Sequence, residues 1–287
     1  MSFSASRTPS EPAAPHAVGQ RIVLSISDLR KSFGGQVVLD GVAVDLREGE
    51  VVLLRGDNGS GKTTLLNILT GNLEPDSGTI HLRPNGQEET FRFPRKWWES
   101  LNPFDHFTPE RVASEAVGRT WQDVRLFPTL TLSDNIAVAK QRQSGENPFR
   151  ALVPGLSSGE GETSNRLASS TMLAGLGLAG REESSGERIS LGQSKRVAIA
   201  RAVQAGARIL FLDEPLSGLD AAGIEAVLGL LSALARNERL TLVIVEHTFN
   251  ISPRPGFRQH GLDFAQRPYR RADRGGGSCR TLFRCRR

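Results

Sequence analysis

An eight-residue run in the first quarter of the chain constrains the fold more than any other feature. Residues 56–63 read Gly-Asp-Asn-Gly-Ser-Gly-Lys-Thr and fit the pattern G-x-x-x-x-G-K-[ST]. The run lies between a short apolar segment, Val51–Leu54, and a segment with helical spacing of apolar residues, 62–70. A plain glycine-rich turn is the alternative, but the strand-loop-helix context favours a loop whose backbone N–H groups face phosphate oxygens. The sequence therefore predicts a phosphate-binding loop in an α/β protein.

The lysine and the threonine that end this run have separate predicted tasks. Lys62 is expected to reach the β- and γ-phosphates of a nucleotide, and Thr63 is expected to hold Mg²⁺. ATP and Mg²⁺ are the cofactors that this prediction implies. The predicted nucleotide-binding residues of the loop are Gly56, Asp57, Asn58, Gly59, Ser60, Gly61, Lys62, Thr63 and Thr64.

The remaining apolar pattern favours an α/β fold with a mixed sheet flanked by helices. Alternating segments at 21–28 and 37–46 predict antiparallel strands, whereas the continuous apolar runs at 51–54 and 209–212 predict buried parallel strands. A further apolar strand is predicted at 240–245. Helical spacing recurs at 133–142, 166–175, 194–205 and 221–235. The longest apolar runs are far shorter than the roughly 20 residues that a membrane-spanning helix needs, so membrane contact is expected to require a partner.

Two segments interrupt this alternation. Residues 143–165 are rich in Gly, Ser and Glu and are expected to form a mobile surface loop. Residues 84–118 are rich in Pro and aromatic residues and are expected to form an ordered insertion packed on the core. The aromatic residues behind that expectation are Trp97, Trp98, Phe104 and Phe107.

The basic charge of the chain is concentrated at its C-terminal end. The formal net charge is +5, but residues 252–287 alone contain ten Arg and two Asp, so the rest of the chain is mildly acidic. No nucleic-acid partner is therefore expected for the main domain. The two cysteines, Cys279 and Cys285, also lie in this tail and provide no disulfide framework for a core.

Two carboxylates follow the buried strand at 209–212. Asp213 and Glu214 would emerge at the carboxyl edge of the sheet, beside the phosphate loop. Asp213 is expected to support Mg²⁺ through its water shell, and Glu214 to act as the general base that activates the attacking water. Taken alone, an Asp-Glu pair in this position is also typical of a helix cap.

The ordered set of motifs resembles the ATP-binding-cassette (ABC) ATPases. Residues 56–63 and 209–214 match the family's Walker A and Walker B motifs. Residues 217–220, Ser-Gly-Leu-Asp, match its D-loop, and His247 matches its switch histidine. The resemblance implies that His247 contacts the γ-phosphate and that Asp220 belongs to the nucleotide site, whereas a lone histidine after a strand is more often structural.

A further match stands at 189–193, where Ile-Ser-Leu-Gly-Gln occupies the place of the family's signature sequence. The resemblance implies that Ser190, Gly192 and Gln193 close over ATP held by a second, head-to-tail subunit. A serine that only caps a helix is the alternative. Leu191 departs from the usual glycine and is expected to alter dimer affinity more readily than chemistry.

Two other positions take their expected roles from the family. Gln122 matches the Q-loop glutamine, and the resemblance implies a catalytic residue that contacts Mg²⁺ and links the nucleotide to the transmembrane partner, although a lone glutamine is usually a polar surface residue. The run 125–132 after it is similar to the coupling region of branched-chain amino acid and urea importer ATPases. Phe33 occupies the place where the family stacks an aromatic ring on adenine, with a plain core residue as the alternative.

The sequence thus predicts an ABC ATPase domain at 21–251, with an antiparallel β subdomain and a helical subdomain at about 123–188. Residues 1–20 are expected to be a disordered leader, and residues 252–287 an Arg/Gly-rich tail that is either disordered, the product of a frameshift or truncation, or a basic arm. Expected partners are transmembrane permease subunits, a second ABC ATPase as homodimer or heterodimer, and a solute-binding protein in the same complex. The expected location is cytoplasmic and peripheral on the inner face of the cell membrane. The alternatives are a soluble ABC ATPase and a nucleotide-binding subunit with little turnover.

Overall fold

A computed structural model describes residues 21–56, 59–84, 86–95, 107–140, 159–246 and 261–264, and for residues 55, 159–166 and 261–264 it describes the backbone only. The predicted leader at 1–20 lies outside these residues, as do Trp97, Trp98 and Phe104. Within the described part of the chain no helix is long and apolar enough to cross a membrane.

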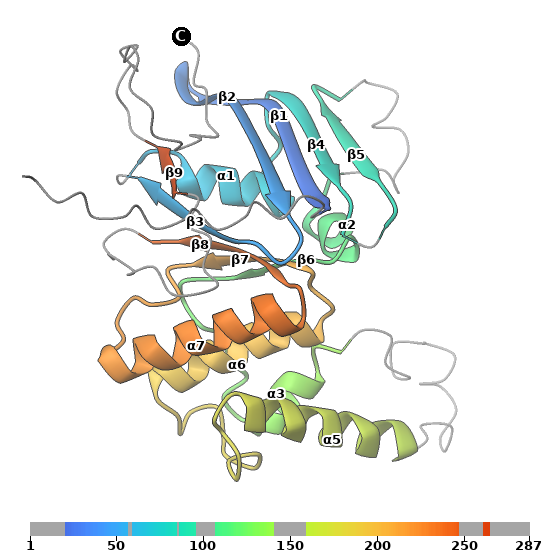
Figure 1. Ribbon diagram of the computed structural model, residues 1–287, viewed down its shortest axis with the longest axis vertical. Coiled ribbons are helices and arrows are strands. Elements are labelled where there is room, and N and C mark those ends of the chain that lie inside the picture. The colour runs from blue at the N-terminus through green and yellow to red at the C-terminus, as the bar shows by residue number, and fades with distance from the viewer. Residues whose placement is uncertain are drawn as a thin grey trace, which may run out of the picture.

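The strands form two sheets of different kind. The first is antiparallel, with the order β2-β1-β4-β5, and comprises β1 (Ile22–Phe33), β2 (Gln36–Arg47), β4 (Ser77–Leu82) and β5 (Glu89–Phe93). The second is parallel, with the order β6-β7-β8-β3-β9. Its strands are β6 (Val117–Thr120), β7 (Ile209–Asp213), β8 (Thr241–Val245), β3 (Val51–Gly56) and β9 (Gly261–Phe264). The expected α/β class is confirmed, and Figure 1 shows both sheets.

The central strands of the parallel sheet are buried on both faces because they carry runs of apolar residues, Val51–Leu54, Ile209–Leu212 and Leu242–Val245. Along β3, Val52 and Leu54 face a core shared with the antiparallel sheet and with α1 (Lys62–Leu69), which lies between the two sheets in Figure 1. Val51 and Leu53 point the other way, into a core with α6 (Leu191–Gln204) and α7 (Ala221–Asn237). This period of two places helices on both faces of the sheet.

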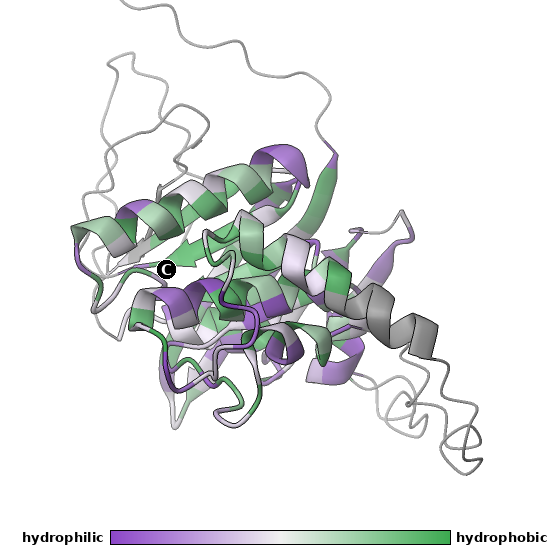
Figure 2. Cartoon of the chain, turned by 90° about the horizontal axis from the view of Figure 1, so that it is seen from below, coloured by the Kyte–Doolittle hydropathy of each residue, from purple (hydrophilic) through white to green (hydrophobic). Residues whose placement is uncertain are grey.

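A third core joins the remaining helices. It packs α3 (Leu132–Ala137) and α5 (Gly159–Gly175) against α6 through buried residues such as Ile136, Leu173 and Val197. In Figure 2 the strands at the centre are coloured mainly hydrophobic, whereas hydrophilic residues gather on outer turns and loops. The predicted split of a helical subdomain at 123–188 stays a prediction, since α6 contributes to this core as well.

The aromatic insertion is ordered where the structure describes it. Phe107 is buried and packs edge-on against Phe91 and Phe93, with ring centroids 4.9 and 5.1 Å apart. A short helix follows, α2 (Pro109–Ser114), which begins at the capping residue Thr108. This packing agrees with the expectation for Phe107 that the segment lies on the core.

Two sequence expectations differ from the structure. Helix α5 begins at Gly159, so the last part of the segment predicted as a loop, 143–165, is helical. Residues 261–264, expected in a tail without regular structure, form β9 beside β3. This pairing uses backbone groups of β3 that would otherwise lie at a sheet edge, and the short Gly-Leu-Asp-Phe run gave no strand signal among Arg and Gly.

Candidate nucleotide-binding and hydrolysis site

The phosphate loop connects β3 to α1, and two of its glycines adopt conformations that other residues avoid. Gly59 has a φ of 78° and Gly61 a φ of 97°. A Cβ atom at Gly61 would also lie 3.1 Å from the carbonyl oxygen of Val38 in β2. Asp57 and Asn58, the other predicted loop residues, lie outside the described part of the chain. Glycine is therefore required at Gly59 and Gly61 by the backbone conformation, and at Gly61 also by the lack of space for a side chain.

Lys62 is the first residue of α1, and it is only 3% exposed. Its Nζ donates a hydrogen bond of 2.6 Å to the carbonyl oxygen of Gly56 and lies 3.4 Å from the Ser60 hydroxyl. The ammonium group is thus held inside the loop, near the helix N-terminus, where an anion is favoured. Thr63, which follows, is exposed, and Thr64 is half-buried.

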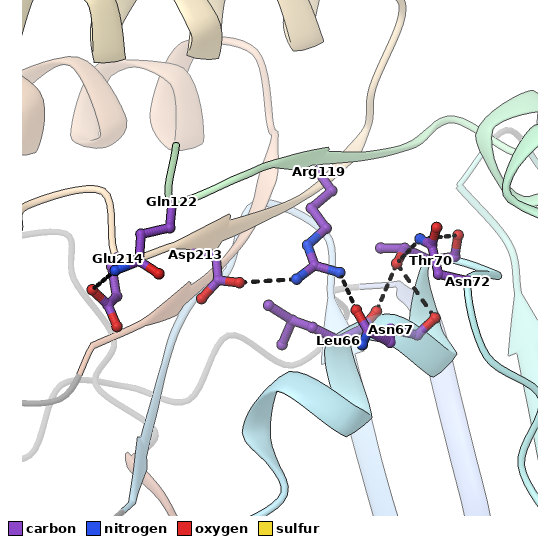
Figure 3. A network of polar contacts seen from close by, with 8 residues as sticks. All are labelled: Leu66, Asn67, Thr70, Asn72, Arg119, Gln122, Asp213 and Glu214. Atoms are coloured by element: carbon purple, nitrogen blue, oxygen red, sulfur yellow. Dashed lines mark hydrogen bonds and ion pairs between the residues drawn. The ribbon is translucent and has the colours of Figure 1, made fainter. Parts of the chain in front are cut away.

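The two predicted carboxylates lie side by side at the end of β7. Glu214 takes a left-handed backbone conformation, with a φ of 48°, and its N–H donates to the carbonyl oxygen of Val245 at 3.0 Å. Gln122, which follows the end of β6, donates from Nε2 to Oε2 of Glu214 at 2.9 Å (Figure 3). Two predicted catalytic residues that are 92 positions apart in the sequence are therefore in direct contact.

The carboxylate of Asp213 has a neighbour that the sequence did not indicate. Arg119, in β6, pairs with it at 2.9 Å and is 5% exposed (Figure 3). Hydroxyl and carboxylate oxygens are suitable ligands for Mg²⁺, which in proteins commonly uses one or two such groups together with phosphates and water. The Thr63 hydroxyl and the Asp213 carboxylate therefore fit this ion.

Two more buried charged residues bind the backbone next to Asp213 and Glu214, which we call the acidic pair. Lys195, in α6, donates to the carbonyl oxygens of Glu214 and Ser217 at 2.9 and 2.7 Å, and burial lowers its pKa. Glu246, directly after β8, accepts from the N–H of Leu216 at 2.9 Å, and burial raises its pKa to about 6. The backbone of residues 214–217 is thereby fixed from two elements. Neither residue stood out in the sequence, because one lies in an ordinary amphipathic helix and the other beside the more conspicuous His247.

The signature residues serve in the structure as a helix cap. Ser190 is the N-cap of α6, and its hydroxyl accepts from the N–H of Gln193, while Oε1 of Gln193 accepts from the N–H of Ser190. Leu191, beside them, is 48% exposed, and Gly192 is half-buried. This reciprocal pair is a capping box. The roles of these residues toward a nucleotide stay predictions.

Asp220 has a comparable local role. It is the N-cap of α7, and its Oδ1 accepts from the N–H of Gly223 at 2.8 Å. The switch residue His247 lies outside the described residues, so its predicted contact stays a prediction.

Phe33 lies at the end of β1 with its ring 48% exposed. The Nζ of Lys31 lies 5.4 Å from the ring centroid, and Lys31 itself pairs with Asp76 at 2.8 Å. The ring is therefore not part of the core, and the alternative of a plain core phenylalanine is wrong. An exposed ring on a rigid strand is suitable for stacking on a planar base.

The phosphate site follows β3, and the two carboxylates lie at the end of β7 in the same parallel sheet, with β8 between the two strands. This combination defines a nucleotide-binding α/β protein of the phosphate-loop class. The family model described as "ABC transporter" matches residues 39–217. The chain therefore belongs to the ABC transporter family, and it is an ATP-binding ATPase of that family.

Curated relatives share this assignment. The branched-chain amino acid transport ATP-binding protein LivG of Salmonella typhimurium is 31% identical over 231 residues, which are 80% of this chain and 83% of LivG. The L-cystine transport system ATP-binding protein TcyN of Escherichia coli is 33% identical over 229 residues, 80% of this chain and 82% of TcyN.

Solved structures agree with the fold. The ADP conformation of MJ1267, an ATP-binding cassette of an ABC transporter, has a TM-score of 0.61 and 25% identity, covering 80% of this chain and 83% of the other. The ATP-binding cassette MJ0796, solved as a dimer in a post-hydrolysis state with ADP and Pi, has a TM-score of 0.56 and 25% identity, covering 79% and 89%.

Proposed function

We propose that this chain is the ATP-hydrolysing subunit of an importer for amino acids or a related small solute such as urea, and that it works as a head-to-tail dimer. The observation that carries the proposal is the hydrogen bond between Gln122 and Glu214 at the edge of the sheet where the phosphate loop also lies. It joins the segment expected to contact a membrane partner to the residue expected to activate water. Relatives named for amino acid transport support the solute class.

Within one subunit the residues divide the chemistry as follows. Lys62 and the loop glycines bind the β- and γ-phosphates, and the Phe33 ring stacks on adenine. Thr63 and Asp213 would hold Mg²⁺ together with Gln122, and the ion would supply positive charge for the phosphate oxygens. Glu214 accepts a proton from the attacking water as general base.

The second subunit completes the site. Ser190 and Leu191, at the start of α6, are exposed, so this helix N-terminus is accessible to the γ-phosphate of ATP bound by another copy. A helix N-terminus carries partial positive charge, and Ser190, Gly192 and Gln193 supply small or polar groups for close approach. Asp220, at the start of α7, lies on the same proposed interface. A homodimer meets these needs, and so does a heterodimer with a second ABC ATPase.

The proposed contact with permease subunits lies on the surface formed by the Q-loop and α3. Trp121 is 55% exposed, Phe127 49% and Val138 48%. Exposed apolar side chains of this size on neighbouring segments are typical of a protein contact. With permease subunits in a membrane and a solute-binding protein in the same complex, the chain would lie on the cytoplasmic, inner face of the cell membrane as a peripheral subunit.

The experiment that tests this function is Mg²⁺-dependent phosphate release by the purified chain. Glu214→Gln keeps the shape of the side chain and removes the base, so turnover should fall by about 100-fold or more while ATP still binds. Glu238→Gln makes the same chemical change at an exposed helix end and serves as the matched control, with unchanged turnover expected. Equal turnover in wild type and Glu214→Gln would overturn the assigned role.

A further inference from the structure

Arg119 makes contacts that none of the predicted roles requires. It lies in β6, three positions before Gln122, and its side chain is 5% exposed. Its Nη2 pairs with Oδ2 of Asp213 at 2.9 Å, and its Nη1 donates to Oδ1 of Asn67 in α1 at 2.6 Å (Figure 3). We call this pair of contacts the Arg119 bridge. It connects the strand that carries the acidic pair to the helix that begins in the phosphate loop.

A third contact fixes the guanidinium group in place. Its Cζ lies 4.0 Å from the ring centroid of Trp121, two residues further along the chain. An arginine presents a planar fork that can donate to two acceptors at once and stack on a ring, whereas a lysine offers a single point charge. The Arg119 bridge therefore depends on arginine and not only on a positive charge.

The position of Asn67 connects the Arg119 bridge to Thr63 in the phosphate loop. Asn67 follows Thr63 by four positions in α1, and residues four apart lie on the same face of a helix. The bridge thus spans from the face of α1 that carries Thr63 to the carboxylate of Asp213. These are the two residues that the proposed function assigns to Mg²⁺.

Arg119 in β6 and Gln122, two residues after β6, each contact one residue of the acidic pair. Arg119 engages Asp213 in a nearly buried ion pair, where water and salt screen it little. Gln122 is exposed and engages Glu214 by a single hydrogen bond, which can exchange when a ligand enters. In the ion pair Arg119 uses only Oδ2 of Asp213, so Oδ1 takes no part in it.

We propose that Arg119 is a positioning residue for the metal-bound nucleotide, and this rests on the proposed function. By holding Asp213 and the Thr63 face of α1 at a fixed separation, it sets the spacing between the two protein groups that Mg²⁺ requires. Arg119 acts through Asp213 and Asn67 and does not itself bind the nucleotide. A purely structural ion pair would affect folding stability without changing the response to Mg²⁺.

The test measures binding of a fluorescent ATP analogue to the full chain across a range of Mg²⁺ concentrations and in EDTA. In Arg119→Lys the half-saturating Mg²⁺ concentration should rise about tenfold, as for other residues that orient metal ligands. Binding of the analogue in EDTA should change by less than about twofold, because the phosphate loop is intact. A thermal melt of each variant reports whether it is folded.

Arg201→Lys is the matched control. The guanidinium of Arg201 donates to the backbone carbonyl of Arg125 at 2.8 Å and, like that of Arg119, lies near an aromatic ring, 5.1 Å from the ring centroid of Phe127. The same substitution there changes a guanidinium hydrogen bond and a ring contact, but at a residue that contacts neither Asp213 nor Asn67 in the interactions described. Its Mg²⁺ response should equal that of wild type.

A second variant keeps the proposal testable if Arg119→Lys does not fold. Asn67→Ala removes the other end of the bridge and leaves the ion pair, so the half-saturating Mg²⁺ concentration should rise by about threefold. Thr70→Val is its control in the same region, since the Thr70 hydroxyl donates to the carbonyl oxygen of Leu66 and has no part in the bridge.

The outcomes separate this inference from the function on which it rests. Wild-type protein whose binding of the analogue does not respond to Mg²⁺ would contradict the proposed metal site itself. A normal wild-type response that Arg119→Lys or Asn67→Ala retains would overturn the positioning role. Equal losses of binding in Mg²⁺ and in EDTA would also overturn it, since they would indicate a structural role alone.

Discussion

The phosphate-loop side and the signature side of this ATPase differ in how their functional residues are held. On the first side, Lys62, Asp213 and Glu214 each contact a partner from another element or loop segment: Gly56, Arg119 and Gln122. On the second side, the side chains of Ser190 and Asp220 accept from N–H groups three residues ahead, as caps of their own helices. Contacts within one chain therefore preorganise the hydrolytic half, whereas the signature residues lie at an exposed helix start, where the proposed second copy would bind.

The largest effect should follow from removing the lysine of the first side. Lys62→Ala deletes a buried ammonium group that would otherwise bind phosphate, and ATP affinity should fall by about 100-fold. Isothermal titration with ATP measures this loss. The melting temperature without nucleotide should stay close to that of wild type, which would show that the variant is folded. ATP binding with the wild-type dissociation constant would contradict the role of the loop.

The next prediction concerns the support behind the carboxylates. Lys195→Met leaves the carbonyl groups of Glu214 and Ser217 without their charged donor, so the free energy of unfolding should fall by about 2 kcal/mol. Urea denaturation measures this change, and phosphate release should fall with it because Glu214 is displaced. Lys31→Met is the matched control, because its ion pair with the more exposed Asp76 contributes less than about 1 kcal/mol.

A smaller loss of stability, about 1 kcal/mol, is expected from a substitution on the signature side. Ser190→Ala should cost about 1 kcal/mol of stability, as expected for a lost helix cap. Thr131→Ala removes the equivalent cap of α3 and should cost a similar amount. Phosphate release should fall about tenfold in Ser190→Ala alone, because only Ser190 is proposed to donate to the phosphate of a partner subunit. Equal turnover in the two variants would mean that Ser190 is a cap and nothing more.

The smallest effect is a dependence on pH. Burial raises the pKa of Glu246 to about 6, above its ordinary value of 4.5, so the folded state binds this proton more tightly than the unfolded state. The contribution of protonated Glu246 to the free energy of unfolding is therefore fully present below pH 4.5, and it is lost as the pH rises through about 6. Glu246→Gln keeps an acceptor for the N–H of Leu216 and removes the titration. Its stability relative to wild type should increase by about 1 kcal/mol between pH 4.5 and pH 7, measured by denaturation at each pH.

The sequence predicted those parts of the fold and site that depend on local pattern. The phosphate loop, the apolar runs of β3 and β7 and the pair Asp213–Glu214 are each readable within a few residues. The Arg119 bridge was not readable, because it joins residues 52 and 94 positions apart and depends on β6 lying beside β7. Nothing in the four-residue sequence of β6 indicates that it pairs with β7. Strand β9 was missed for a similar reason, since its pairing with β3 is long-range.

If a second copy completes the signature half, ATP should cause the chain to dimerise, and sedimentation velocity measures this. Glu214→Gln is expected to bind ATP without hydrolysing it, so in sedimentation velocity it should form a dimer with ATP and remain a monomer with ADP. Adding Ser190→Arg to this variant places a bulky side chain at the proposed interface and should keep it monomeric in ATP. A monomer in both nucleotides, or a dimer that Ser190→Arg leaves intact, would contradict the claim.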